Sequence, residues 1–171
     1  MTPDPYYNPD CALYLALDFG WRNPTVNLWI QPDRKWERVI VLFAHYQTLG
    51  TNEENAKLAL KIHQERGYGL LAQPIGGWGD PSKPEALVTY SQVFGSEIKG
   101  PRQSVQWGHE LVKQWLKTSK QSRGEMGLVF SRYCPQRLFV EMREYEKHEP
   151  GKGAHHAPDA LRYFFAGWVG A

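Results

Sequence analysis

The sequence predicts an α/β fold in which one mixed β-sheet carries helices on both faces. Three strand-like segments, 12–19, 25–30 and 36–46, follow one another with short turns, which indicates an antiparallel meander. After residue 50 the apolar pattern changes to a helical period and then alternates between short strands and helices. The chain has 171 residues, 42% hydrophobic and 22% charged, which is typical of one globular domain.

Within the meander, 36–46 has the strongest β pattern because five consecutive apolar residues, 39–43, lie in it. A helix is expected over 52–66, ended by Gly67, and a short apolar strand over 70–75. Ser82 and Glu85 form an S-x-x-E pattern that predicts a capping box at the start of a helix over 83–94.

The remaining segments alternate in the same way. We expect a brief strand over 96–99, a helix over 105–116, a polar loop over 117–125, a strand over 127–131, and helices over 135–145 and 158–168. A three-strand meander followed by alternating strands and helices is the order of the ribonuclease H-like fold.

Composition excludes several classes of protein. The longest stretch without a charged residue, 39–52, is too short and too polar to cross a bilayer, and the N-terminus does not resemble a secretory signal. Cys11 and Cys134 form no CxxC or zinc spacing, so reduced thiols and an intracellular protein are expected. The net charge of +2 argues neither for nor against a polyanionic partner.

Asp18 is the first candidate for chemistry because it ends an apolar strand in which every neighbour favours a core. An ionised carboxylate there is costly unless a cation or several donors satisfy it. The alternative is structural: Asp18 starts the turn at 20–23 or pairs with Arg22.

Asp80 and Asp159 also allow two interpretations. Asp80 follows the expected fourth strand, where open α/β sheets bind ligands, but Gly-Asp-Pro is also an ordinary turn. Asp159 lies one residue after Pro158, so it is explained equally well as a residue of a helix start. Together with Asp18, however, these carboxylates match the oxygen ligands of hard divalent cations.

Three segments carry a resemblance to a known family: Leu17-Asp18-Phe19-Gly20 with Asn23-Pro24-Thr25, Gly79-Asp80-Pro81-Ser82, and His156-Ala157-Pro158-Asp159-Ala160-Leu161-Arg162-Tyr163. They resemble the nuclease domain of large terminase subunits of tailed bacteriophages, over about residues 13–165. The Asp-Ala-Leu-Arg-Tyr ending is the most specific of them.

The resemblance implies that Asp18, Asp80 and Asp159 bind two Mg²⁺ or Mn²⁺ ions, with His156 beside the metals as a further catalytic residue. It implies an endonuclease that cuts double-stranded DNA with little sequence preference during viral genome packaging. The implied partners are the terminase ATPase domain, the small terminase subunit and the portal, and the implied location is the host cell cytoplasm.

The chain departs from a complete large terminase because it has no G-x-x-x-x-G-K-[ST] phosphate loop. We therefore expect a single ribonuclease H-like nuclease domain over 12–171, with 1–11 as a tail or the remnant of a linker to the motor. The missing loop also argues against a nucleotide-binding domain.

Candidate DNA contacts come from a basic stretch and from a glycine-rich loop. They are Lys99, Arg102, Lys117, Lys120, Arg123 and Lys152. The stretch 99–123 is explained equally well as the solvated face of a helix. Trp21 and Trp78 are expected at the rim of the active site, whereas Trp29, Trp107, Trp115 and Trp168 fall in apolar, core-forming patterns.

Two other functions remain open. The first is another nuclease of the same fold, of the ribonuclease H or Holliday-junction resolvase type. The second is a DNA-binding module of this fold without catalysis, which would bind DNA with a steep salt dependence and would not cleave it.

Overall fold

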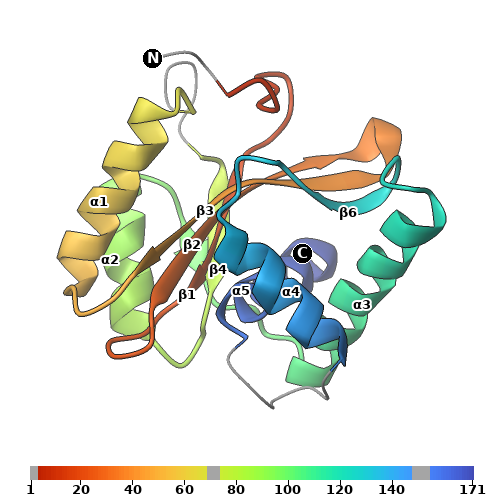
Figure 1. The fold of residues 1–171 in the computed structure, drawn as a ribbon. Helices are drawn as coiled ribbons and strands as arrows, with labels where there is room; N and C mark the ends of the chain where they lie inside the picture. Colours follow the sequence, from red (N-terminus) through yellow and green to blue (C-terminus); the bar gives the residue numbers. More distant parts are fainter. Residues whose placement is uncertain (1–3, 69–73, 148–154) are drawn as a thin grey trace.

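A six-stranded sheet forms the middle layer of the molecule, with its strands in the order β5-β4-β1-β2-β3-β6 (Figure 1). We describe it from a computed structural model that places residues 4–68, 74–147 and 155–171. The strands are β1 (Tyr14–Asp18), β2 (Thr25–Asp33), β3 (Arg38–Gln47), β4 (Gly76–Gly79), β5 (Ile98–Lys99) and β6 (Gly127–Phe130). β1, β2 and β3 pair antiparallel, whereas β4 joins β1, β5 joins β4 and β6 joins β3 in parallel. The predicted meander and mixed sheet are confirmed.

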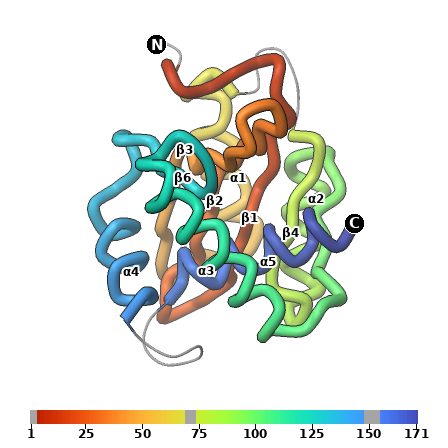
Figure 2. The backbone as a smooth tube through the Cα atoms, turned by 90° about the vertical axis from the view of Figure 1, so that its right-hand side faces the viewer, coloured from red at the N-terminus to blue at the C-terminus, as the bar shows by residue number. Residues whose placement is uncertain are grey.

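Helices cover both faces of this sheet. They are α1 (Asn52–Glu65), α2 (Pro84–Phe94), α3 (Val105–Gln121), α4 (Gln136–Lys147) and α5 (His156–Gly170). α1 and α2 lie on one face, and α3, α4 and α5 on the other. Figure 2 looks onto the second face, where α5 crosses the strands and contacts β1, β2 and β4.

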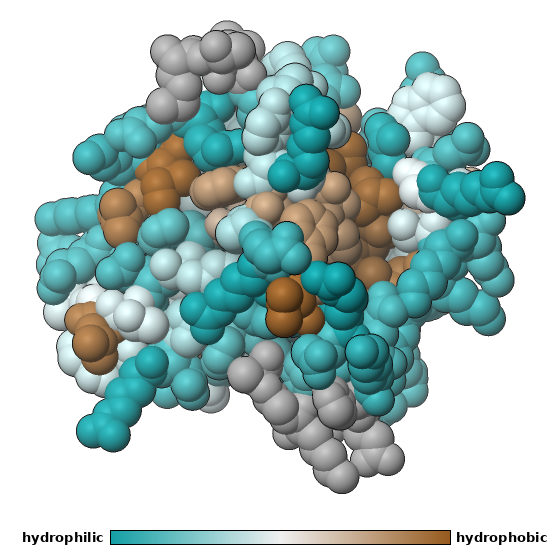
Figure 3. Space-filling model, in the orientation of Figure 1, coloured by the Kyte–Doolittle hydropathy of each residue, from teal (hydrophilic) through white to brown (hydrophobic). Residues whose placement is uncertain are grey.

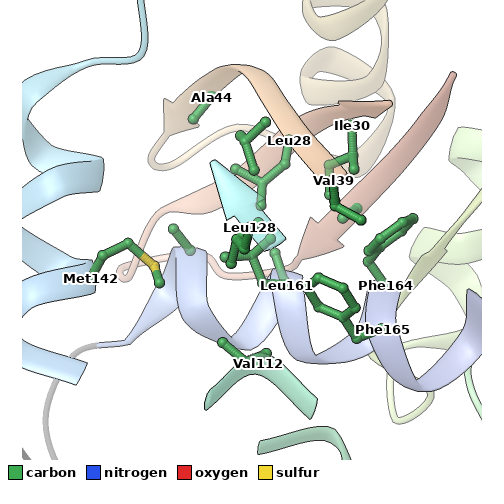
Figure 4. Packing of buried hydrophobic residues seen from close by; sticks show 14 of the residues in the cluster. Leu28, Ile30, Val39, Ala44, Val112, Leu128, Met142, Leu161, Phe164 and Phe165 are labelled. Carbon is green, nitrogen blue, oxygen red and sulfur yellow. The ribbon is translucent and has the colours of Figure 1, made fainter. Parts of the chain in front are cut away.

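Alternation along β1 directs successive side chains into two separate cores. Leu15 and Leu17 pack with α1 and α2, whereas Ala16 faces α5. The core under α5 is the larger one, and Figure 4 shows Leu161, Phe164 and Phe165 of α5 against side chains from β2 and β3. Asp18 has the same parity as Ala16, so its side chain lies on the α5 face of the sheet.

The fourth strand differs from the prediction. The apolar segment 70–75 was expected there, but β4 is Gly76–Gly79, while Pro74 and Ile75 precede it and 70–73 lie outside the described residues. The glycines allow a close approach, since a Cβ on Gly77 would come within 2.5 Å of the Leu15 carbonyl oxygen. Strand propensity cannot detect such a strand, because the absence of side chains is what permits its pairing.

Three further details correct the sequence predictions. α3 continues through 117–121, which was expected to be a loop. The capping box is absent, because α2 starts after Lys83 with Pro84 in its first turn, and Ser82 hydrogen-bonds Asp80. Trp78 is not at a rim: it lies in β4, is only 7% exposed and packs against α5 at Gly167, where a Cβ would overlap its ring.

Residues 4–11 lie against the rest of the domain. The Asp4 carboxylate accepts hydrogen bonds from the Tyr68 hydroxyl at 2.6 Å and from Arg66 at 3.1 Å. The backbone N–H of Asn8 donates to the side chain of Gln31 at 2.9 Å. This segment therefore has fixed contacts with α1 and β2 from Asp4 onward.

The surface is mostly polar, with apolar residues gathered in a band across the middle of the view in Figure 3. Among the described residues, no helix is both long and apolar enough to cross a membrane. Cys11 and Cys134 are both free thiols.

Candidate metal centre

Strand register brings Asp18 and Asp80 together. In the parallel pair β1–β4, Leu17 lies opposite Gly79, so the next residues along the two strands are Asp18 and Asp80. Both strands end there in the same direction, and such carboxyl ends form the edge where α/β sheets bind ligands. Asp18 and Asp80 therefore follow two neighbouring strand ends at the same edge of the sheet.

The start of α5 reaches the same edge. His156 Nδ1 lies 3.4 Å from Asp18 Oδ2, and both side chains are largely buried, at 14% and 13% exposure. Asp159 follows in the first turn of the helix. The helix start is itself capped from α4, because Glu141 Oε1 accepts the backbone N–H of Ala157 at 2.9 Å.

The electrostatics of Asp18 reflect this gathering of acids. Burial raises the pKa of Asp18 to about 6, the hydrogen bond with His156 opposes that rise, and the negative charges of Asp159 and Asp80 add to it. In return, the Asp18 carboxylate raises the pKa of His156 against the effect of burial. The same three acids contribute to raising the pKa of Tyr163, although burial is the main cause.

Two of the carboxylates are held by neighbours. Asp80 Oδ1 accepts hydrogen bonds from the Ser82 backbone N–H at 2.9 Å and from the Ser82 hydroxyl at 2.7 Å. Asp159 Oδ1 lies 3.5 Å from the Arg162 guanidinium, which partly offsets the rise that burial causes in the pKa of Asp159. In this arrangement, no group of three or more His, Cys, Asp or Glu side chains among the described residues is close enough to hold a metal ion.

The acids nevertheless have the chemistry that hard cations need. Their carboxylate oxygens are the kind of ligand that such cations take. Burial is the main cause of the raised pKa of Asp18, and the negative charges of Asp159 and Asp80 add to it, so a bound cation would favour the ionised form of Asp18. The chemistry of these side chains therefore suits a divalent cation.

Comparison with known proteins supplies the fold. No family model matches the sequence, and no curated protein matches it either. Among solved structures, the nuclease domain of the P22 large terminase superposes with a TM-score of 0.68 at 18% identity, over 95% of this chain and 84% of that one. The SPP1 large terminase nuclease domain with bound Mn has a TM-score of 0.58 at 18% identity, over 90% and 85%.

This chain has the fold of a large terminase nuclease domain. The predicted ribonuclease H-like class is confirmed. The large terminase of a thermophilic bacteriophage, in complex with ADP, superposes with a TM-score of 0.68 at 18% identity, over 96% of this chain. This chain spans about two fifths of that protein, 41% of its length.

The predicted DNA contacts fall at two places in this terminase-like fold. Lys99 pairs with Trp78 at the end of β5, and Gly100 packs against Pro81, so Lys99 and Arg102 lie on the Asp80 side of the site. The other group is at the opposite end of the sheet. This second group consists of Lys117, Lys120 and Arg123. It lies at the end of α3, whose last turns pack on Gly127, and Gly127 pairs with Arg38 at the start of β3. Lys120 forms an ion pair with Glu146. Lys152 lies outside the described residues.

Sequence reasoning did not single out Glu141 and Arg162 as parts of this site. Arg162 is inside the Asp-Ala-Leu-Arg-Tyr segment, and its guanidinium lies 4.4 Å from the Tyr163 ring centre as well as beside Asp159. Its spacing of three residues from Asp159 on one helix was a usable signal. Glu141 had no comparable signal, because its partner at Ala157 is a backbone amide sixteen residues away.

Proposed function

We propose that this protein is a divalent-metal-dependent endonuclease that hydrolyses DNA, acting in an infected cell as the nuclease of a viral packaging machine. The observation that carries the proposal is geometric: strand register sets Asp18 and Asp80 at neighbouring strand ends, and the start of α5, which carries His156 and Asp159, reaches Asp18. The fold shared with terminase nuclease domains supports it. We expect double-stranded DNA to be cut with little sequence preference.

In this proposal Asp18, Asp80 and Asp159 would hold two Mg²⁺ or Mn²⁺ ions. Bound cations would lower the pKa of a water and offset the charge that develops on a phosphodiester during hydrolysis. The SPP1 nuclease domain, whose structure carries bound Mn, supports the choice of a divalent ion. Asp18 and Asp80 are fixed by strand register, and Asp159 is fixed by the docking of α5.

His156 and Arg162 act on these carboxylates. His156 Nδ1 faces Asp18, so it would orient that side chain and hold a proton close to it near neutral pH. Arg162 would stabilise Asp159 until a cation takes its place. Lys99 and Arg102 are positioned to contact phosphates on the Asp80 side, without reading the base sequence.

The parent assembly belongs to the proposal as well. We infer that the domain 12–171 operates beside a terminase ATPase domain, a small terminase subunit and a portal, which would deliver DNA to it. The ADP-bound large terminase described above, of which this chain spans 41%, supports this inference. An isolated domain is therefore expected to cut DNA slowly.

The decisive experiment is plasmid digestion with Mn²⁺ or Mg²⁺, with and without EDTA. The wild type should nick and linearise the plasmid, EDTA should stop it, and Asp80→Ala should be inactive while keeping its circular dichroism spectrum. Asp33→Ala is the matched control, because Asp33 ends β2 at the opposite end of the sheet. Full activity in Asp80→Ala would refute the proposal.

Substrate choice distinguishes the remaining alternatives. A preference for an RNA–DNA hybrid or for a four-way junction would replace the terminase-type assignment by a ribonuclease H or resolvase type. Binding of DNA without cleavage under every metal condition would indicate a non-catalytic module of the same fold.

A further inference from the structure

A groove of about 610 Å³ opens next to the acidic edge of the sheet, and the metal centre does not use it. Three segments line it: the loop after β1, the loop that leads from β3 into α1, and the start of α2. Figure 1 shows the first two loops side by side at the lower left. The groove adjoins the acids in the chain, because Phe19 follows Asp18, and Ser82, which hydrogen-bonds Asp80, forms part of its wall.

One of the residues that line this groove is an exposed tryptophan. Trp21 lines it with 55% of its surface exposed, although burying so large a side chain would ordinarily be favourable. Phe19, by contrast, packs its ring 5.4 Å from that of Tyr90 and so belongs to the groove and to the core at once.

The backbone that carries Trp21 is held firmly. The Thr25 hydroxyl accepts the Gly20 N–H at 3.0 Å and donates to the Gly20 carbonyl at 2.9 Å. The Trp21 carbonyl accepts the backbone N–H of Leu49 at 3.0 Å, which joins the two loops. An exposed aromatic ring on a fixed loop is a preorganised contact surface, because little conformational freedom remains to be lost on binding.

The other lining groups suit a nucleotide. Lys83 supplies a positive charge to the same groove as the aromatic rings of Phe19 and Trp21, and Glu85 is its acidic lining residue. The hydroxyl groups of Thr51 and Ser82 already bond Glu54 and Asp80. Aromatic side chains with neighbouring cations are the surfaces on which single-stranded nucleic acids stack their bases, since every base has a flat face.

We propose that this groove is a subsite for a nucleotide adjacent to the phosphate that is cut, with its base stacked on Trp21. The inference rests on the proposed function for its choice of ligand. Inside an intact duplex both faces of a base are covered by neighbouring bases, so a base that stacks on Trp21 has to come from a strand that is single or locally opened.

The experiment measures binding in EDTA, where no cleavage occurs, by the fluorescence anisotropy of labelled twelve-residue strands. One strand is oligothymidylate, and the other has the same phosphates with abasic residues in place of the bases. The wild type should bind oligothymidylate about tenfold more tightly than the abasic strand, and Trp21→Ala should lose that preference. Trp21→Phe should keep most of it.

Trp36→Ala is the matched control, because Trp36 is 57% exposed but lies between β2 and β3, at the other end of the sheet. Lys83→Ala should reduce the salt dependence of binding, whereas Trp21→Ala should leave it unchanged, since no phosphate contact is removed. Equal preference in Trp21→Ala and Trp36→Ala, or no preference in the wild type, would overturn the subsite.

The two proposals fail separately. Asp80→Ala should lose cleavage but keep its preference for strands with bases. A protein that binds oligothymidylate through Trp21 yet never cuts DNA would refute the nuclease and would leave only a base-stacking site, without a neighbouring phosphate that is cut. If the protein cuts DNA and Trp21→Ala binds both strands as the wild type does, the subsite is refuted and the nuclease stands.

Discussion

Asp18→Asn should make the protein more stable while it abolishes cleavage. The pKa of Asp18 is about 6 in the folded protein, because of burial and the neighbouring acids, against about 4 in an unfolded chain. Between these values the folded state binds a proton that the unfolded state has lost, so stability falls as pH rises from about 4 to about 6. Above pH 6 the full penalty applies, at most about 3 kcal/mol.

Urea unfolding at pH 4 and at pH 8 measures this effect. The variant should match the wild type at pH 4 and exceed it by about 1–3 kcal/mol at pH 8, and Asp33→Asn should show no such gain. Mn²⁺ should raise the melting temperature of the wild type, because it binds only the folded state, and should raise that of the variant much less. A variant that is less stable than the wild type at pH 8 would show that Asp18 is not under electrostatic strain.

Three other predictions follow from the packing of α5 and α1. Glu141→Ala should lower stability by about 1–3 kcal/mol in urea unfolding and should slow cleavage, since it leaves the Ala157 N–H at the start of α5 without its acceptor. Glu141→Gln, which retains an acceptor, should lose much less. Gly167→Ala should lower the free energy of unfolding by about 1–3 kcal/mol, because the added Cβ would overlap the Trp78 ring. Gly170→Ala is the control on the same helix, because its Cβ would meet only a flexible Gln103 side chain. Equal melting temperatures for the two variants would contradict this prediction. Burial lowers the pKa of His63 to about 4, so below about pH 6.5 the unfolded chain takes up a proton that the folded protein does not. The free energy of unfolding should therefore fall by up to about 3 kcal/mol as the pH drops from about 6.5 to about 4. His63→Gln should flatten this part of the curve of stability against pH.

The parts of the fold that were predicted correctly are those where side chains carry a period. Leu15 and Leu17 face one core and Ala16 the other, which is the alternation that marks β1 in the sequence. α1 was found for the same reason, since Ala56, Ala59 and His63 belong to its buried face. β4 was missed because its pairing depends on glycines, which carry no such pattern.

The sequence could name three candidate acids but not the contacts that each of them makes. Each acid has a sufficient local explanation, and Asp159 alone is indistinguishable from a helix start. The placement of the three acids at one edge of the sheet depends on the register of β1 with β4 and on the docking of α5. A short sequence motif specifies neither of these. The present partners of the acids, Ser82 and Arg162, depend on rotamers that sequence does not encode.

The acids of the site come from the first strand, the middle of the chain and the last helix, at residues 18, 80 and 159. During synthesis the first strand leaves the ribosome long before α5, so Asp159 can approach Asp18 only after α5 has docked on the sheet. The site of the proposed nuclease would therefore be completed only at the last step of folding.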